Sequence, residues 1–234
     1  MRVVRNQEFI KKRTQFTQRG SLAGLGLLLI SLFLSGKNPL VSWLFLIVGF
    51  VVAMAAVRVG NRFVRPPRPD LLLDRVLKGL DNRYILYHYF YPAEHLLLTP
   101  SGLIDIRMQE QRGEIQVRGE RWQQRPLWQR LRTFLGEVGL GNPTHRMHYE
   151  LAQTARDLKE LVGEDSELPL DGIIVFYSGR TSLDVQDSEF PVVVCEDLKA
   201  AIRAMVKERA PLSTSRRKAL AAALSGEGPA EEEE

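Results

Sequence analysis

Residues 21–58 read SLAGLGLLLISLFLSGKNPLVSWLFLIVGFVVAMAAVR, and this stretch decides the fold of the N-terminal part of the chain. It holds two apolar runs, 21–35 and 40–57, and neither carries a charge. A helix needs about 17–25 apolar residues to span the hydrocarbon core of a bilayer; the second run meets that length and the first is at its short end. Backbone groups in lipid must bond internally, so both runs are predicted to be helices. The GKNP sequence at 36–39 separates them, which predicts a transmembrane helical hairpin.

Positive charges flank the hairpin at its two outer ends. The cations before the first run are Arg2, Arg5, Lys11, Lys12, Arg13 and Arg19, and those after the second run are Arg58, Arg62, Arg65 and Arg68. The turn between the runs carries only Lys37. The positive-inside rule therefore predicts a multi-pass protein of the cell membrane with its N- and C-termini in the cytoplasm. The lipid bilayer is its first expected partner, and the cations could also bind anionic headgroups.

Three other interpretations of residues 21–58 remain open. A cleaved signal peptide would have a shorter basic region and a small-x-small cleavage site, and the second run would still span. A buried hairpin of a soluble protein would carry polar positions on an outer face. A single span with the other run lying in the interface is the third alternative.

Composition divides the rest of the chain. The expected parts are a basic cytoplasmic segment (1–20), two transmembrane helices (21–58), a Pro/Arg linker (59–69), an α/β domain (70–211) and an Ala- and charge-rich tail with an acidic end (212–234). The prolines at 66–69 form a stiff spacer. A single cysteine, Cys195, excludes an internal disulfide and favours reducing surroundings.

The domain at 70–211 alternates between helical and strand patterns. Helices are predicted at 72–80, 127–135, 142–162 and 198–206, with a partly helical segment at 213–230. Strands are predicted at 84–90, 95–98, 103–108, 114–117, 170–177 and 190–195. In the strand at 103–108, alternation places Leu103, Asp105 and Arg107 on one face and the intervening apolar residues on the other. This order predicts one mixed α/β domain with helices on both faces of a mixed sheet.

Residues 74–122 resemble the nuclease-related domain (NERD) of the restriction-endonuclease-like superfamily. The resemblance is carried by DRVL at 74–77, AEHLLLTPSG at 93–102, GEI at 113–115 and GERW at 119–122. Asn142-Pro143 and GIIVF at 172–176 are similar to the family's later helix and strand. The resemblance covers about half of the chain and implies a restriction-endonuclease-like mixed sheet with flanking helices.

The family pattern implies a divalent cation held between two carboxylates beside a lysine. It places an Asp before the His of the second strand and, after a Ser-Gly turn, a Glu and a Lys one residue apart on the next strand. In this chain those positions are Glu94, Arg107 and Gln109. A cation thus stands where the family has a metal ligand, and Asp105 with Arg107 mimics the acid-x-base pair in a shifted register. The family's glutamine after Asn-Pro is Arg146 here.

Several functions are open for this domain. We favour a catalytically degenerate NERD-like domain without a cofactor, which acts as a binding or scaffold module at the cytoplasmic membrane face. The alternative is a Mg²⁺-dependent nuclease that acts on DNA through Glu94 and Asp105, with Asp74 as a third carboxylate. A purely structural membrane protein is a further rival. The residues leave the partner open between nucleic acid and an unidentified protein.

Two more groups of side chains are candidate sites. Five arginines lie among tryptophans and could contact phosphates of nucleic acid or lipid: Arg118, Arg121, Arg125, Arg130 and Arg132. The alternative is a solvated face whose tryptophans, Trp122 and Trp128, lie in the core. His145 and His148, with Glu150 nearby, could form a metal pair, or could simply be solvated.

Overall fold

The structure is a computed structural model, and it describes residues 1–125, 139–162 and 169–225. The chain forms two compact units. The first unit contains residues 1–6 and the described residues of 72–125 and 140–225, and the second contains residues 7–71 and 139.

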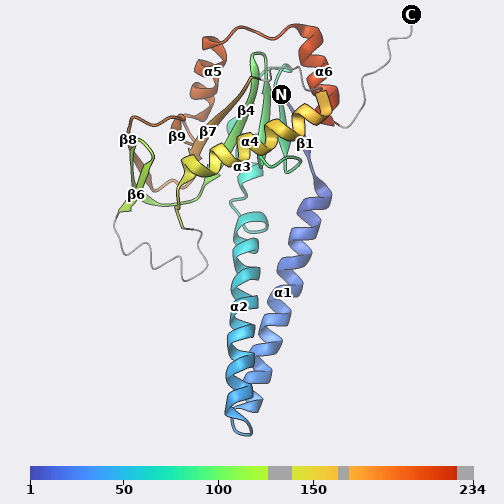
Figure 1. The fold of residues 1–234 in the computed structure, drawn as a ribbon, viewed down its shortest axis with the longest axis vertical. Coiled ribbons are helices and arrows are strands. Elements are labelled where there is room, and N and C mark those ends of the chain that lie inside the picture. The colour runs from blue at the N-terminus through green and yellow to red at the C-terminus, as the bar shows by residue number, and fades with distance from the viewer. Residues whose placement is uncertain (126–138, 163–168, 226–234) are drawn as a thin grey trace, which may run out of the picture. The chain divides into compact units, whose positions relative to one another are not determined.

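The second unit is a helical hairpin of α1 (Gln7–Leu34) and α2 (Pro39–Phe63) (Figure 1). Asn38 ends the turn and caps α2, because its side chain accepts a hydrogen bond from the Val41 N–H. Pro39 at the first helical position needs no backbone partner there. Both helices are long and apolar enough to cross a membrane, and each extends beyond the apolar runs into the basic flanks.

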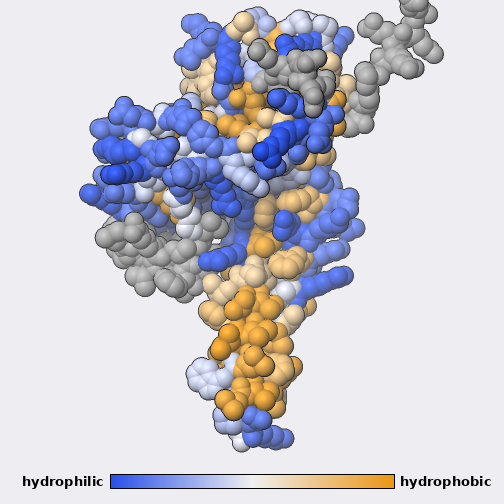
Figure 2. All heavy atoms as spheres, viewed as in Figure 1, coloured by the Kyte–Doolittle hydropathy of each residue, from blue (hydrophilic) through white to orange (hydrophobic). Residues whose placement is uncertain are grey.

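Small residues line the contact between the two helices, and large apolar residues face outward. The buried residues are Gly24 and Ser31 on α1 and Ser42, Gly49, Ala56 and Gly60 on α2. The exposed ones include Leu22, Leu32, Phe33, Leu40, Trp43 and Leu44. Figure 2 shows the resulting hydrophobic surface along the hairpin. Close packing through small residues with apolar side chains outside is typical of helices in lipid, so the hairpin is compatible with a membrane element.

Two serines join the helices inside the apolar part of the hairpin. Ser31 Oγ donates to the Ser42 carbonyl at 2.9 Å, and Ser42 Oγ donates to the Ser31 carbonyl at 2.8 Å. Both side chains are buried, so each hydroxyl proton is satisfied within the hairpin. Interhelical hydrogen bonds of this kind help to hold helices together where no hydrophobic force between them exists.

The first unit is built on a six-stranded mixed sheet in the order β1-β2-β3-β4-β7-β9. Its strands are β1 (Arg2–Arg5), β2 (Ile85–His88), β3 (His95–Thr99), β4 (Gly102–Gln109), β7 (Leu170–Phe176) and β9 (Val192–Val194). Neighbouring strands are parallel except where β3 pairs with β2 and β4. A second sheet in the order β6-β5-β8 contains β5 (Gly113–Arg118), β6 (Arg121–Arg125) and β8 (Thr181–Gln186).

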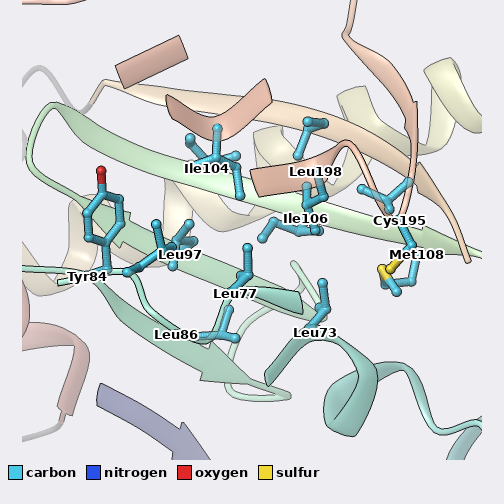
Figure 3. Close-up of a cluster of buried hydrophobic side chains, with 14 residues drawn as sticks. Leu73, Leu77, Tyr84, Leu86, Leu97, Ile104, Ile106, Met108, Cys195 and Leu198 are labelled. Carbon is cyan, nitrogen blue, oxygen red and sulfur yellow. The ribbon is translucent and has the colours of Figure 1, made fainter. Parts of the chain in front are cut away.

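Helices cover both faces of the six-stranded sheet, as the sequence predicts. On one face, α3 (Pro69–Val76) and α5 (Leu198–Glu208) pack through residues such as Leu73 and Ile202 against the sheet (Figure 3). On the other face, α4 (Pro143–Val162) and α6 (Thr214–Ser225) contribute Leu158 and Leu220. The mixed α/β class is therefore confirmed, with a buried core on each side of the sheet.

The N-terminal strand β1 is not predicted by the sequence pattern. Residues 2–5 pair in parallel with residues 85–88, so part of the expected basic segment 1–20 belongs to the sheet, and α1 begins at Gln7. Only two of the four residues of β1 are apolar, and Arg2 and Arg5 flank them, so the strand has no clear hydrophobic pattern. No local pattern can show a pairing partner so distant in sequence. The hairpin is thus an insertion between β1 and the rest of the domain.

Other local expectations differ from the structure. The expected linker 59–69 is helical through Phe63 and again from Pro69. The sequence pattern misses strand β8 and indicates β6 only as an extension of β5, because both strands are short and polar. The helix expected at 127–135 lies outside the described residues.

We expect β1 to stabilise the domain measurably when the hairpin is removed. A chain in which a short Gly/Ser linker replaces residues 7–68 should be more stable than the fragment 69–234 by about 2 kcal/mol or more, because Val3 and Val4 pack against the cores on the two faces. A short linker is enough because the end of β1 lies close to α3, as the ion pair between Arg5 and Asp74 shows. Urea denaturation of both proteins measures the difference, and equal midpoints would show that β1 contributes nothing.

Candidate functional site

The central strand β4 presents a polar stripe on the face covered by α4. Alternation places Asp105, Arg107 and Gln109 together on this face, as predicted, and all three are buried. Ile104, Ile106 and Met108 point to the opposite face, into the core shared with α3 and α5 (Figure 3). Three polar side chains, two of them charged residues, thus lie together in the interior of the central strand, which makes this stripe the main candidate site.

Arg107 forms a buried ion pair with Glu150 of α4. The Arg107 Nη1 donates to Glu150 Oε1, and the two side chains are only 4% and 12% exposed. From the sequence, Glu150 is identified only as a neighbour of His145 and His148, and not as the partner of Arg107. The helical period could have indicated that Glu150 faces the interior. It lies three residues after buried Met147 and four before buried Thr154, and therefore on the same side of α4.

Asp105 is the most unusual group of the site. It is fully buried, and neither of its carboxylate oxygens has a hydrogen-bond partner among the described residues. Burial raises the pKa of Asp105 well above its usual value of 3.8, and the negative charges of Glu150 and Glu94 raise it further, while Arg107 opposes the shift. Glu150, Arg107 and Glu94 are therefore the charged groups that act on Asp105, and we refer to these four residues as one electrostatic cluster.

The Asp105→Asn variant is expected to be relatively more stable as the pH rises. The folded-state pKa of Asp105 lies above the unfolded value, so the folded protein holds a proton that must be lost as the pH rises through the folded pKa. The stability that protonated Asp105 contributes is fully present below pH 3.8 and is lost above it. Denaturation of both proteins between pH 4 and pH 9 should give a difference that grows in favour of Asn. A constant difference would contradict the raised pKa.

Asp74 does not join this cluster. It lies on α3, on the other face of the sheet, where it forms an ion pair with Arg5 and contacts His88, with His88 Nε2 3.2 Å from Asp74 Oδ1. His88 Nδ1 lies 2.8 Å from His95 Nδ1, and both rings are fully buried. Sequence reasoning missed this histidine pair, because His88 and His95 are cross-strand neighbours only through the β2–β3 register. The candidate third carboxylate of a nuclease site is therefore separated from Asp105.

The arginines of the second sheet are at its surface. Arg118 pairs with Asp184 of β8 at 2.6 Å, and Arg121 and Arg125 are exposed on β6. Trp122 donates from Nε1 to Thr144 at 2.9 Å and stacks on Phe176. Arg130, Arg132 and Trp128 lie outside the described residues.

The remaining candidates do not converge on a common site. His148 contacts Glu189 at 2.8 Å and His145 lies 3.6 Å from Glu120, both at the exposed surface, whereas Glu150 faces Arg107. Arg146 is exposed beside them. Cys195 is buried just after β9, and burial raises the pKa of its thiol to about 11, so it is not a reactive thiolate at neutral pH.

Comparisons of the chain with models of protein families, with curated proteins and with solved structures find no match. The chemistry of the site therefore has to be argued from its own residues.

Proposed function

We propose that this protein is a membrane-anchored, catalytically degenerate nuclease-related domain that acts as a binding or scaffold module at the cytoplasmic face of the membrane. The observation that carries this proposal is the buried Arg107–Glu150 ion pair. In the resemblance to the nuclease-related domain, Arg107 stands at a metal-ligand position. A guanidinium there repels a divalent cation, and its ion pair with Glu150 holds it inside the domain.

The membrane part of the proposal is supported by β1. Strand β1 precedes the hairpin, and its partner β2 follows it. Both ends of the hairpin must therefore lie on one side of any membrane that it crosses. The cations at those two ends favour the cytoplasmic side.

A rebuilt site provides the functional test. The double variant Arg107→Glu/Gln109→Lys places an acid and a lysine on the β4 face beside Asp105 and Glu94. We expect the unmodified full chain in detergent to show no Mg²⁺ or Mn²⁺ binding at millimolar metal and no cleavage of DNA. The rebuilt chain should bind metal, and Mg²⁺ should raise its melting temperature, because an ion that binds only the folded state stabilises it.

A matched control has the same two substitutions on a solvent-exposed strand. Arg121→Glu/Gln123→Lys changes β6, where alternate side chains are exposed, and should leave metal binding absent. The alternative function, a nuclease acting through Glu94 and Asp105, is favoured by the negative charge of Glu94 that acts on buried Asp105. Metal-dependent DNA cleavage by the unmodified chain that disappears in Glu94→Ala would replace our proposal with this nuclease.

The proposed orientation predicts that the turn at 35–38 faces the outside of the cell. In a Cys195→Ala background, a cysteine at Asn38 should react with an impermeant thiol reagent added to intact cells, because Asn38 ends the turn opposite the basic ends. A cysteine at the exposed position Arg83 of the first unit should react only after lysis. The reverse pattern would show that the hairpin has the opposite orientation.

A further inference from the structure

We propose that the basic end of the hairpin is a binding surface for anionic phospholipid headgroups. This inference rests on the membrane anchoring proposed above, and it adds a partner for a charged surface of the second unit. We call this surface the hairpin neck. It consists of Lys11, Lys12, Arg13 and Arg19 of α1, with Arg58, Arg62 and Arg65 at the end of α2.

The packing of the helices sets the level of each cation along the hairpin. A Cβ on Gly20 would contact Ala56 at 3.1 Å, and a Cβ on Gly60 would meet Thr17 at 2.8 Å. Arg19 and Arg58 lie between these two contacts, so they share one level, immediately beyond the apolar block. Both are exposed. The headgroup region on each side of a bilayer is about 5–8 Å thick, so this first pair of arginines lies within it when the apolar block fills the hydrocarbon core.

A second level of cations is organised by two aromatic rings. Phe9 of α1 and Phe63 of α2 meet edge to face with their centroids 5.6 Å apart. The Arg13 guanidinium lies 4.9 Å from the Phe9 ring and 5.6 Å from the Phe63 ring, and that of Arg62 lies 5.9 Å from Phe63. These contacts keep the two arginines near the helix surface, where Arg13 is about 9 Å beyond Arg19 along α1. The neck therefore presents cations at both the inner and the outer edge of the headgroup region.

The positive charge of the neck and the apolar helix faces next to it both favour lipid as the ligand. Glu8 is the only acidic residue in 7–65, and it pairs with Lys12. The neck is continuous with helix faces whose exposed side chains are apolar, so a molecule with an anionic head and hydrocarbon tails matches both surfaces at once. A nucleic acid or free phosphate would match only the charged part. Each cation near an anionic surface strengthens such binding about fivefold.

The test measures lipid selectivity of the full chain. The protein is reconstituted in phosphatidylcholine nanodiscs, and electron spin resonance compares the motionally restricted fractions of spin-labelled phosphatidylglycerol and phosphatidylcholine. We expect phosphatidylglycerol to be preferred, and 0.5 M NaCl to reduce the preference. The Arg19→Gln/Arg58→Gln variant removes two cations and should reduce the preference by up to about 25-fold. The Lys37→Gln variant, which removes a cation from the opposite end of the hairpin, should retain it.

Each outcome decides a different question. Equal restriction of the two lipids by the wild-type protein overturns the headgroup inference, and it leaves membrane anchoring intact. A loss of preference in Lys37→Gln but not in the neck variant also overturns it. If millimolar inorganic phosphate or a short DNA duplex abolishes the preference, the neck binds phosphate groups rather than lipid. Failure of the wild-type chain to enter nanodiscs at all would instead refute the proposed anchoring. The salt titration needs only the wild-type protein, so misfolding of a variant cannot mask the result.

Discussion

Replacing Arg107 with methionine is expected to lower the free energy of unfolding by about 3–5 kcal/mol, because it leaves Glu150 and Asp105 without their cation in a buried site. The Arg107 side chain is 4% exposed, so water cannot take over its role. Methionine keeps much of the side-chain volume, which limits the contribution from a cavity. Urea denaturation of the full chain in detergent, followed by the tryptophan fluorescence of the first unit, measures the loss.

Two further variants separate the buried charge from general damage. Arg107→Met/Glu150→Leu removes both partners and should recover most of the stability, because a buried ion pair can often be replaced by apolar residues at little cost. Arg118→Met breaks an ion pair with Asp184 at the exposed surface, and it should change stability little. A single Arg107 variant as stable as the wild type would show that the pair does not hold the site together.

The second large effect is expected inside the hairpin, at Gly24. A Cβ at Gly24 would lie 2.8 Å from the Ala53 backbone nitrogen and 2.9 Å from its Cβ. Backbone cannot give way as a flexible side chain can, so Gly24→Leu should weaken the association of α1 with α2 by about 3 kcal/mol, the upper end for overpacking. The loss can be read from disulfide formation between cysteines at Ser31 and Ser42, whose hydroxyl oxygens are 3.3 Å apart, in a Cys195→Ala background.

Gly26 supplies the matched control for this change. It lies two residues away on the same helix, and a Cβ there would meet no atom within 4 Å. Gly26→Leu adds the same side chain to the same apolar helix and should leave disulfide formation unchanged. Equal rates in the two leucine variants would mean that the close approach at Gly24 does not determine how the helices pack.

Local sequence patterns predict the parts of the fold that depend on local physics. The hairpin follows from two charge-free runs and a Gly-Lys-Asn-Pro break, and the strand at 103–108 follows from alternation of apolar and polar residues. The two faces of that strand are predicted correctly, so the sequence alone is enough to place Asp105 and Arg107 on one face. These inferences need only the period of a helix or a strand.

Long-range pairings cannot be predicted in the same way. Glu150 reaches Arg107 across 43 residues, and His88 meets His95 only through strand register. Strand β1 depends on a partner 83 residues away, since Arg2 is opposite Ile85. No period in a single sequence encodes such contacts, which are set by topology and register. The sequence therefore predicts the site as a face of one strand, whereas its ion pair follows only from the tertiary structure.

The early position of β1 in the chain has a consequence for synthesis. Residues 2–5 leave the ribosome before the hairpin, and their partner strand follows only after the whole hairpin has been made. At about 5–20 residues per second, this delay is on the order of 4–16 s. A hairpin that failed to return to its starting side would leave β1 and β2 on opposite sides of the bilayer. If the hairpin spans a membrane as proposed, only a chain whose hairpin returns to its starting side can complete the sheet and pack Val3 and Val4 against the two cores.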